Sequence, residues 1–367
     1  MQNVAAIIVG FLVLGYVLLG VSDFSPTPIS GNDDILIGFI GPLSGDGAAW
    51  GEIERNSIQL EVDKINAKGG INGRHIKLIV EDGRCEGAAA VSAAHKLIDS
   101  DGVRILLVSC SQEVLPIAPI ADAEKVLQLA SYSSASSISK AGDYTFRNSW
   151  LNKDMANGMA SEVIIHAKKS AIISEESEFA QDLKNLFVAQ YQELGGAVLS
   201  MQDFPQGSKD VRTQITKILA AKPEVVVVNP NSPATGLAVL KQLKEQGYKG
   251  VVVGNFFGSS VEVQAAPEAK GMIYVADPSV ISTPEKERFF AEYKERFGTT
   301  PSLEWPAVAR YDAVHILEQA IRAVGDDPTV IKNYLYDLKS FTGLIGTYGF
   351  DSNGDVVGIK PTVAVIK

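Results

Sequence analysis

Short runs of β-branched and other apolar residues alternate with helical patterns through most of this chain. "ILIGFI" precedes a helical pattern that places apolar residues on one face (Ile58, Val62 and Ile65). "IKLIVED", "VRILLVS" and "VLQLAS" follow, separated by two further helical patterns. Apolar strands that alternate with helices indicate a parallel sheet covered on both faces. The first part of the chain is therefore predicted to form a doubly wound α/β lobe.

The same order of elements restarts at "KSAIIS". The helical pattern after this strand ends at a Gly-Gly pair (195–196), as the first long helical pattern does (69–70). "AVLSM", "EVVVV" and "GVVVG" are the next strand patterns, and residues 285–324 contain two more helical patterns. The last residues predict a hairpin that turns at Asn353-Gly354. We expect two similar α/β lobes.

An apolar segment, residues 4–21, contains no charged residue. It is long enough to cross a bilayer as a helix, and it is equally compatible with the core of a secretory signal. Residues 1–22 are therefore predicted to be a hydrophobic helix that serves as a signal peptide or a membrane anchor, with 23–34 as a linker. We favour an uncleaved anchor. In either case the body is expected to be exported, to the periplasm or the cell surface.

Composition and motifs argue against several function classes. A chain of 367 residues can hold two domains, and its net charge of -10 argues against nucleic acid as a partner. The four His show no ligand spacing, so no metal site is expected, and no Gly-x-Ser-x-Gly nucleophile motif is present. The carboxylate pair Glu175-Glu176 is interpreted as a solvated loop end. No catalytic set and no cofactor site emerge, and the sequence favours binding over catalysis.

The two cysteines, Cys85 and Cys110, each lie just beyond the end of an apolar strand. Neighbouring parallel strands would bring these ends together, and an exported pair favours a disulfide. Closing this loop of about 26 residues would stabilise the fold by about 3.5 kcal/mol in the chain-entropy model. The alternative is a pair of free thiols in the core.

The glycine-rich stretch "IGFIGPLSGDGAAWG" at 37–51 first suggests a phosphate-binding loop. A Walker loop needs a Lys at the start of the helix, and no Lys occurs between 34 and 63. The glycine order also departs from G-x-G-x-x-G, and Pro42 removes one amide donor. What remains is a backbone-lined turn with Ser44, at the carboxyl end of a strand, where open α/β sheets bind ligands. Trp50 adds an apolar wall.

Two more turns follow strands of the same predicted sheet. In "SCSQE", Ser111 begins a helix, and its hydroxyl and the nearby amides are suited to an anion. "YSSASSIS" at 132–139 is dense in hydroxyl groups, although a solvated Ser-rich loop is the alternative interpretation. Because the three turns converge at one edge of the sheet, together they favour a ligand site.

Six stretches carry a family resemblance. They read "IGFIGPLSGDGAAWG", "INAKGGINGRHIKLIVEDGRCEGAAA", "VSCSQE", "YTFRNSW", "ARYDAVHILEQAIRAVG" and "FTGLIGTYGFDSNGDVVG". In this order and spacing the chain resembles the solute-binding proteins of ABC importers with the type I periplasmic-binding fold. It is most similar to the leucine/isoleucine/valine-binding branch. The resemblance spans nearly all of residues 35–367.

The resemblance implies two lobes joined by a three-strand hinge. Residues 35–148 with 280–342 would form the first lobe, and 149–279 with 343–367 the second. Hinge closure would bury a small molecule (an amino acid, carboxylate or amide) between them, and a membrane permease would be the protein partner. A sensor or receptor domain of the same fold is the alternative. An enzyme that acts in the cleft is a weaker alternative.

The resemblance also implies ligand contacts. Ser111, Tyr132 and Ser134 occupy positions that bind a ligand carboxylate in relatives, and Trp50 would face Phe179 across the cleft. Trp305 completes the expected set in the first lobe. Hydrogen bonds from hydroxyl and amide groups suit a carboxylate, because bonds to a charged group are the strong ones.

Two departures from the family pattern concern the ligand's amino group. Amino-acid binders of this branch place a Glu after the strand that here reads "VVVG", where this chain has Phe256. The Tyr of the preceding turn is replaced by Asn231 or Ser232. Two residues are candidates for a substitute carboxylate: Glu304, which lies beside Trp305, and Asp203, in "MQDF". We therefore expect a small carboxylate or amide-like ligand with an apolar or planar body, with a free α-amino acid as the alternative.

Overall fold

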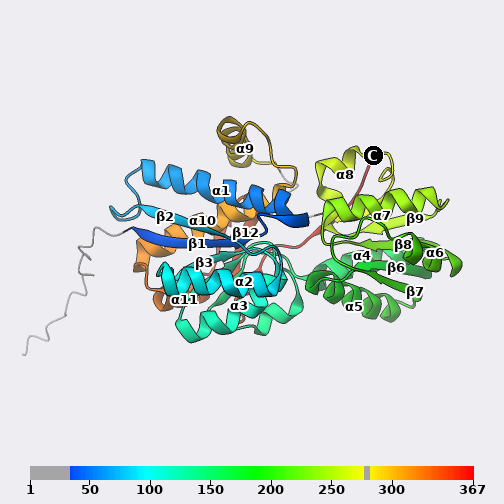
Figure 1. The fold of residues 1–367 in the computed structure, drawn as a ribbon, viewed down its shortest axis with the longest axis horizontal. Helices are drawn as coiled ribbons and strands as arrows, with labels where there is room; N and C mark the ends of the chain where they lie inside the picture. Colours follow the sequence, from blue (N-terminus) through cyan, green and yellow to red (C-terminus); the bar gives the residue numbers. More distant parts are fainter. Residues whose placement is uncertain (1–33, 277–281) are drawn as a thin grey trace, which may run out of the picture. The chain divides into compact units, whose positions relative to one another are not determined.

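The computed structural model describes residues 34–276 and 282–367 (Figure 1). The apolar segment at 4–21 lies outside the described residues, so its predicted role as a signal or anchor is untested. Within the described ranges, no helix has both the length and the apolar character needed to cross a membrane.

The first sheet has five parallel strands in the order β2-β1-β3-β4-β5. Its strands are β1 (Ile35–Gly41), β2 (Ile76–Asp82), β3 (Ile105–Val108), β4 (Leu127–Ala130) and β5 (Thr145–Arg147). In β1, Phe39 and Ile40 are both fully buried but belong to different clusters, one on each face of the sheet. The sheet is therefore covered on both sides, as the near-continuous apolar strands predicted.

Helices cover both faces of this sheet. On the face of Phe39, α1 packs against α10, and on the face of Ile40, α2 and a π-helical turn pack with α3. The helical elements are η1 (Gly45–Gly47), α1 (Ala48–Ala67), α2 (Gly87–His95), η2 (Lys96–Ser100), α3 (Ser111–Glu124), η3 (Ser136–Lys140), α9 (Pro284–Phe297), α10 (Glu304–Val324) and α11 (Pro328–Asp337). We call this sheet and these helices the first lobe.

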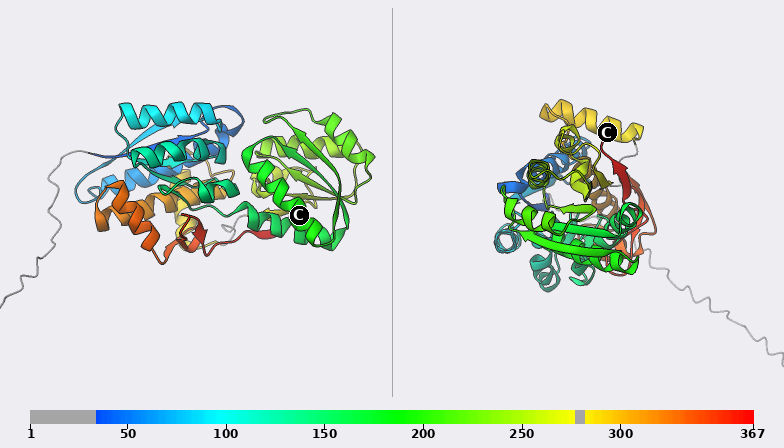
Figure 2. Two further views of the ribbon diagram at one scale, coloured as in Figure 1. Left: turned by 90° about the horizontal axis from the view of Figure 1, so that it is seen from below. Right: turned by 90° about the vertical axis from the view of Figure 1, so that its right-hand side faces the viewer.

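The second sheet repeats the connectivity of the first. Its order is β14-β10-β9-β8-β6-β7, so β7-β6-β8-β9-β10 corresponds to β2-β1-β3-β4-β5, and β14 adds an antiparallel edge. Its strands are β6 (Lys169–Glu175), β7 (Ala197–Phe204), β8 (Val225–Asn229), β9 (Val251–Gly254), β10 (Ile273–Ala276) and β14 (Thr362–Val365). Its helices are α4 (Asn152–His166), α5 (Glu178–Glu193), α6 (Arg212–Ala220), α7 (Pro233–Glu245), η4 (Phe256–Ser259) and α8 (Val261–Ala265). These elements form the second lobe, and the two views in Figure 2 show its helices on both faces of the sheet.

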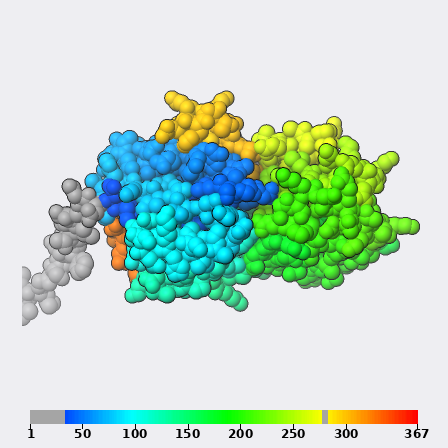
Figure 3. Space-filling view, in the orientation of Figure 1, coloured from blue at the N-terminus to red at the C-terminus, as the bar shows by residue number. Residues whose placement is uncertain are grey.

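The chain passes between the two sheets after β5, between β10 and α9, and before β14. A third, small sheet is formed by β11 (Phe341–Gly343), β12 (Gly346–Phe350) and β13 (Val356–Val357), and the predicted hairpin turn at Asn353-Gly354 is confirmed. The segment 343–367, predicted for the second lobe, contacts both lobes. Its strand β12 packs against α11 of the first lobe, and Phe350 packs against Phe146 of β5. Its last strand, β14, pairs with β10 of the second lobe. Which residues move together about a hinge remains a prediction. In the space-filling view the blue surface of η1 and α1 meets the green surface of the second lobe (Figure 3).

The predicted disulfide is present. Cys85 and Cys110 are bridged, with their Cα atoms 5.5 Å apart. The carboxylate of Glu113 lies beneath the bridge and accepts hydrogen bonds from both cysteine amides, at 2.9 Å from Cys85 and 3.0 Å from Cys110. Burial raises the pKa of Glu113 to about 7, although the bonds from the two amides act in the opposite direction. One carboxylate and one disulfide thus fix the two turns that follow β2 and β3.

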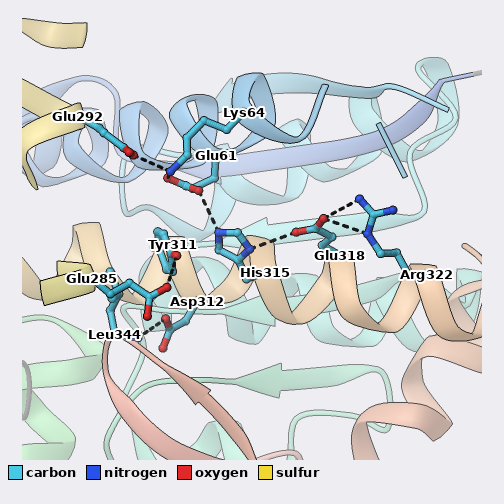
Figure 4. Close-up of polar contacts among 10 residues, drawn as sticks. All are labelled: Glu61, Lys64, Glu285, Glu292, Tyr311, Asp312, His315, Glu318, Arg322 and Leu344. Carbon is cyan, nitrogen blue, oxygen red and sulfur yellow. Dashed lines mark hydrogen bonds and ion pairs between the residues drawn. The ribbon is translucent and has the colours of Figure 1, made fainter. Parts of the chain in front are cut away.

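A chain of charged contacts joins α1 to α10 and α9 (Figure 4). The imidazole of His315 lies between two carboxylates, with Nε2 2.9 Å from Glu61 and Nδ1 3.1 Å from Glu318. Lys64 extends the chain from Glu61 to Glu292 on α9. Burial lowers the pKa of His315, but the hydrogen bonds to Glu318 and Glu61 outweigh it and raise the pKa to about 9. The imidazole is therefore charged at neutral pH.

The protonated imidazole of His315 is expected to make stability depend on pH in a defined window. Because its pKa rises from 6.5 to about 9 on folding, the contribution is complete below pH 6.5 and is lost as the pH rises through 9. With solvent screening, the loss should be about 1 to 2 kcal/mol. Urea unfolding at pH 6, 7.5 and 9 measures it, and His315→Gln should flatten the fall. An equally steep fall in the variant would contradict the assignment.

Removal of the disulfide is expected to destabilise the first lobe without changing its fold. Cys85→Ser with Cys110→Ser should lower the free energy of unfolding by about 3 kcal/mol, because the loop they close is then free in the unfolded chain. Calorimetric melting of the double variant measures the loss. The wild type under strong reductant serves as the control and should melt at the same temperature as the variant; a variant as stable as the oxidised wild type would contradict the expectation.

Candidate functional site

A small cavity lies where the carboxyl ends of strands from both lobes meet. Ser111 follows β3, Tyr132 follows β4, Asn231 follows β8 and Phe256 follows β9, so four strand ends contribute to it. Its volume is about 20 Å³, room for little more than one water molecule. It is lined by Trp50, Cys110, Ser111, Gln112, Tyr132, Ser134, Ser149, Trp150, Phe179, Asn231 and Phe256. Ligands of doubly wound folds bind at this edge of the sheet.

Aromatic rings form most of the apolar wall. The ring of Phe256 makes edge contacts with Tyr132 at 5.3 Å, with Phe179 at 5.3 Å and with Trp150 at 6.1 Å between centroids. Trp50 closes the wall against Tyr132, with centroids 5.9 Å apart. Offset and edge-to-face pairs of this kind contribute about 0.5–1.5 kcal/mol beyond the area they bury. Phe256 on the second lobe therefore packs directly against Tyr132 on the first.

The polar groups of the wall are held by neighbouring turns. The hydroxyl of Ser111, the first residue of α3, accepts a hydrogen bond from the Ala135 amide at 3.4 Å. Ser134 donates to the side chain of Asn152 at 2.7 Å. Asn231 accepts from Ser177 through its side-chain oxygen at 3.2 Å. These contacts orient the serine and asparagine groups of the wall.

Two indole groups of the wall lack an acceptor. The Nε1–H groups of Trp50 and Trp150 are buried and have no hydrogen-bond partner among the described residues. An indole N–H can only donate, and a buried donor without an acceptor costs about 1–3 kcal/mol. An acceptor atom within reach of either indole would remove this cost.

A buried carboxylate braces the second-lobe turns behind Asn231. Glu175 was interpreted from sequence as part of a solvated loop end, and that interpretation is wrong because its side chain is fully buried. It accepts from the Asn231 amide at 2.6 Å, from the Gly207 amide at 2.8 Å and from the Thr235 hydroxyl at 2.8 Å. Burial raises its pKa, and these three bonds act against the rise. Glu175 therefore fixes backbone and does not line the cavity.

Charged side chains are absent from the cavity wall formed by the described residues. The two carboxylates considered as partners for a ligand ammonium are both bound to lysines elsewhere. Asp203 lies 2.8 Å from Lys184, and Glu304 lies 2.6 Å from Lys286. The wall thus offers hydroxyl, amide and indole groups and aromatic faces.

The structure brings together seven of the ten predicted ligand residues, and three lie elsewhere. Ser44 donates to Asp82 at 2.5 Å and lines an outer groove. Ser232 caps the start of α7 and donates to Asp46. Trp305 lies behind the wall, where it packs on Trp150 at 4.2 Å and donates to the Ser131 carbonyl oxygen. The seven in the wall are Trp50, Ser111, Tyr132, Ser134, Phe179, Asn231 and Phe256.

Four residues of the wall were not predicted: Cys110, Gln112, Ser149 and Trp150. The first two flank Ser111, and the last two follow β5, where the chain leaves the first sheet. A large aromatic residue directly after a short strand was the available signal for Trp150. The strand pattern "YTFRN" is too short to show which side chain beyond it would face the cavity.

Comparisons with known proteins agree with this geometry. A family model described as periplasmic binding protein matches residues 34–362. An amino acid binding protein of Pseudomonas aeruginosa is 27% identical over 93% of this chain and 92% of its own length. The leucine-, isoleucine-, valine-, threonine- and alanine-binding protein of the same organism is 25% identical over 90% of this chain and 89% of its own.

Solved structures share the fold. A leucine-binding protein from Thermotoga maritima has a TM-score of 0.80 at 23% identity, over 91% of this chain and 95% of its own. A solute-binding protein from Rhodopseudomonas palustris, in complex with benzoate, has a TM-score of 0.82 at 19% identity, over 91% and 93%. The type I periplasmic-binding fold expected from the sequence is confirmed. The chain belongs to the periplasmic binding protein family and is related to its Leu/Ile/Val-binding proteins.

Proposed function

We propose that this protein is the extracytoplasmic solute-binding subunit of an ABC importer. It captures a small carboxylate or amide solute between its lobes by hinge closure and delivers it to a membrane permease. The observation that carries this proposal is the cavity at the strand ends of both lobes, with polar donors and aromatic rings but no charged side chain among the described residues of its wall. Membership of the family supports an exported, non-catalytic role.

The donors in the wall favour an acceptor-rich end on the solute. Ser111 begins α3, a helix of 14 residues, so a carboxylate beside it would lie at the positive end of the helix dipole. The unpartnered indole N–H groups of Trp50 and Trp150 add two donors that no described residue satisfies. A carboxylate oxygen or an amide carbonyl supplies the missing acceptors.

The apolar part of the wall disfavours an α-ammonium group. Ring faces attract a cation by about 0.5–2 kcal/mol. A primary ammonium buried without a carboxylate costs several kcal/mol, so the ring faces do not compensate. Solved structures of this fold hold isoleucine in one case and benzoate in another, so the fold accepts both solute classes. The uncharged wall supports our proposal that the solute belongs to the second class.

A ligand panel tests the proposed class. We expect 4-methylpentanoate, 3-methylbutanoate and benzoate to raise the melting temperature more than leucine and valine, which carry the ammonium. At a hundredfold excess over Kd, a bound solute should stabilise the protein by about 2.7 kcal/mol. Thermal shift followed by calorimetry measures this. Strong stabilisation by leucine or valine, with none by the desamino acids, would reject the class. Recovery of a chemically altered solute would reject the binding role.

Several hydrogen bonds join the lobes, and one of them lies next to Asn231 of the cavity wall. The Ser232 hydroxyl at the start of α7 donates to the Asp46 carboxylate of η1 at 2.6 Å. Bonds to a charged acceptor are about twice as strong as neutral ones. If the lobes separate, this bond is lost, so it should favour the closed form.

Removal of this bond is expected to weaken solute binding without touching the wall. Asp46→Ala and Ser232→Ala should each raise the Kd for 4-methylpentanoate about fivefold, the effect of about 1 kcal/mol. The double variant should bind no more weakly than Ser232→Ala alone, since both single changes remove the same bond between the lobes, and Ser232→Ala also removes the cap of α7. Ser44→Ala, in the same turn but bonded within the first lobe, is the control and should bind normally. Additive effects in the double variant would argue against a shared bond.

A further inference from the structure

The ring of Phe256 occupies the centre of the aromatic wall. It contacts rings from three separate parts of the chain, with centroid distances of 5.3 Å to Tyr132, 5.3 Å to Phe179 and 6.1 Å to Trp150. Its side chain is only 5% exposed. Because the enclosed space is only about 20 Å³, this ring takes up room that a solute between the lobes would need.

The backbone on the N-terminal side of Phe256 is held by a buried asparagine. Asn255 follows β9, and its side-chain amide donates to Asn229 and to the Pro230 carbonyl oxygen, both at 2.8 Å. Its side-chain oxygen accepts from the Phe257 amide at 3.0 Å. Asn255 therefore ties the turn to the end of β8.

The backbone on the C-terminal side is held by the core. The ring of Phe257 is fully buried, and it lies so close to Gly236 of α7 that a Cβ at that glycine would be 2.3 Å from the ring. A Cβ at Gly258 would be 2.4 Å from the ring of Tyr274. With both neighbours anchored, the backbone of Phe256 has no room to withdraw while the fold is intact.

We propose that Phe256 sets the size limit of the solute. The fixed backbone holds this ring against Tyr132 and leaves about 20 Å³, so a solute must part these two rings to enter, and a wide solute must part them further. A shorter side chain at 256 widens the cavity because the anchored turn does not collapse into the space. This inference rests on the proposed function, in which this cavity is the solute site.

The first test compares carboxylates of increasing width. Calorimetry measures Kd for benzoate, 4-tert-butylbenzoate and 2-naphthoate with the wild type, Phe256→Leu and Phe256→Ala. Relative to benzoate, the two wide acids should bind at least tenfold more tightly to Phe256→Ala than to the wild type. The same affinity ratio for Phe256→Leu should lie between those of the wild type and Phe256→Ala. Ratios that agree within twofold in all three proteins would overturn the proposal. Phe256→Leu keeps an apolar side chain and preserves the test if the alanine variant folds poorly.

A second test does not depend on the solute class. If the wild type binds none of the carboxylates, the proposed class fails, but the role of the ring can still be measured with benzene. An apolar cavity left by a large-to-small substitution binds benzene or xenon. Proton NMR titration should therefore show benzene bound to Phe256→Ala and not to the wild type. Absence of binding to a folded Phe256→Ala protein would overturn the proposal.

A matched variant separates the site from a general loss of an aromatic side chain. Phe290 lies on α9, where its ring packs against Phe289 with centroids 5.4 Å apart, and it does not line the cavity. Phe290→Ala should bind no benzene in the cavity and should keep the wild-type order of carboxylate affinities. A response of Phe290→Ala equal to that of Phe256→Ala would show that the effect is not local, and would overturn the proposal.

Discussion

The guanidinium of Arg310 is fully buried at the carboxyl edge of the first sheet, and the cavity is built above it. It lies 3.0 Å from the carboxylate of Glu54 on α1, and it donates to the Val108 carbonyl oxygen at 2.7 Å and to the Ser131 hydroxyl at 3.0 Å. Arg310 thus joins α10 and α1 to the ends of β3 and β4, whose next residues carry Ser111 and Tyr132. A buried ion pair of this kind is strongly destabilising when one partner is removed, by about 3–5 kcal/mol.

Three buried carboxylates in this protein hold turns. Glu113 accepts two amides below the disulfide, Glu175 accepts two amides behind Asn231, and Asp312 accepts the amides of Leu344 and Ile345. Turn amides have no partner in a strand ladder, and burial without one is costly. Burial raises the pKa of Asp312 to about 7, against the effect of the two amide bonds. These carboxylates hold backbone and do not line the cavity, and the described residues of the cavity wall carry no charge.

Much of the architecture follows from sequence because it depends on local pattern. Apolar strands alternating with amphipathic helices predicted both sheets, and the strand-end positions of Ser111 and Tyr132 predicted their place in the cavity wall. The sequence did not show that Trp150, and not Trp305, lines the cavity. Both are buried and in contact at 4.2 Å, and which indole faces the cavity depends on how α10 is rotated against the end of β5. The same limit applies to Glu175, because its burial requires three turns that are distant in sequence.

Closure on a solute requires a solute that contacts both lobes. A ligand shifts an equilibrium between open and closed forms only by its difference in affinity for the two. Trp50, Ser111 and Tyr132 belong to the first lobe, whereas Phe179, Asn231 and Phe256 belong to the second, and they surround one cavity. A molecule held by the first set alone gains nothing from closure. A molecule that also reaches Phe256 gains the contacts of the second lobe, and it replaces part of the ring contact between Phe256 and Tyr132. In the proposed binding mode, the solute must therefore outcompete a contact that the lobes make with each other, which would link selectivity for size to the free energy of closure.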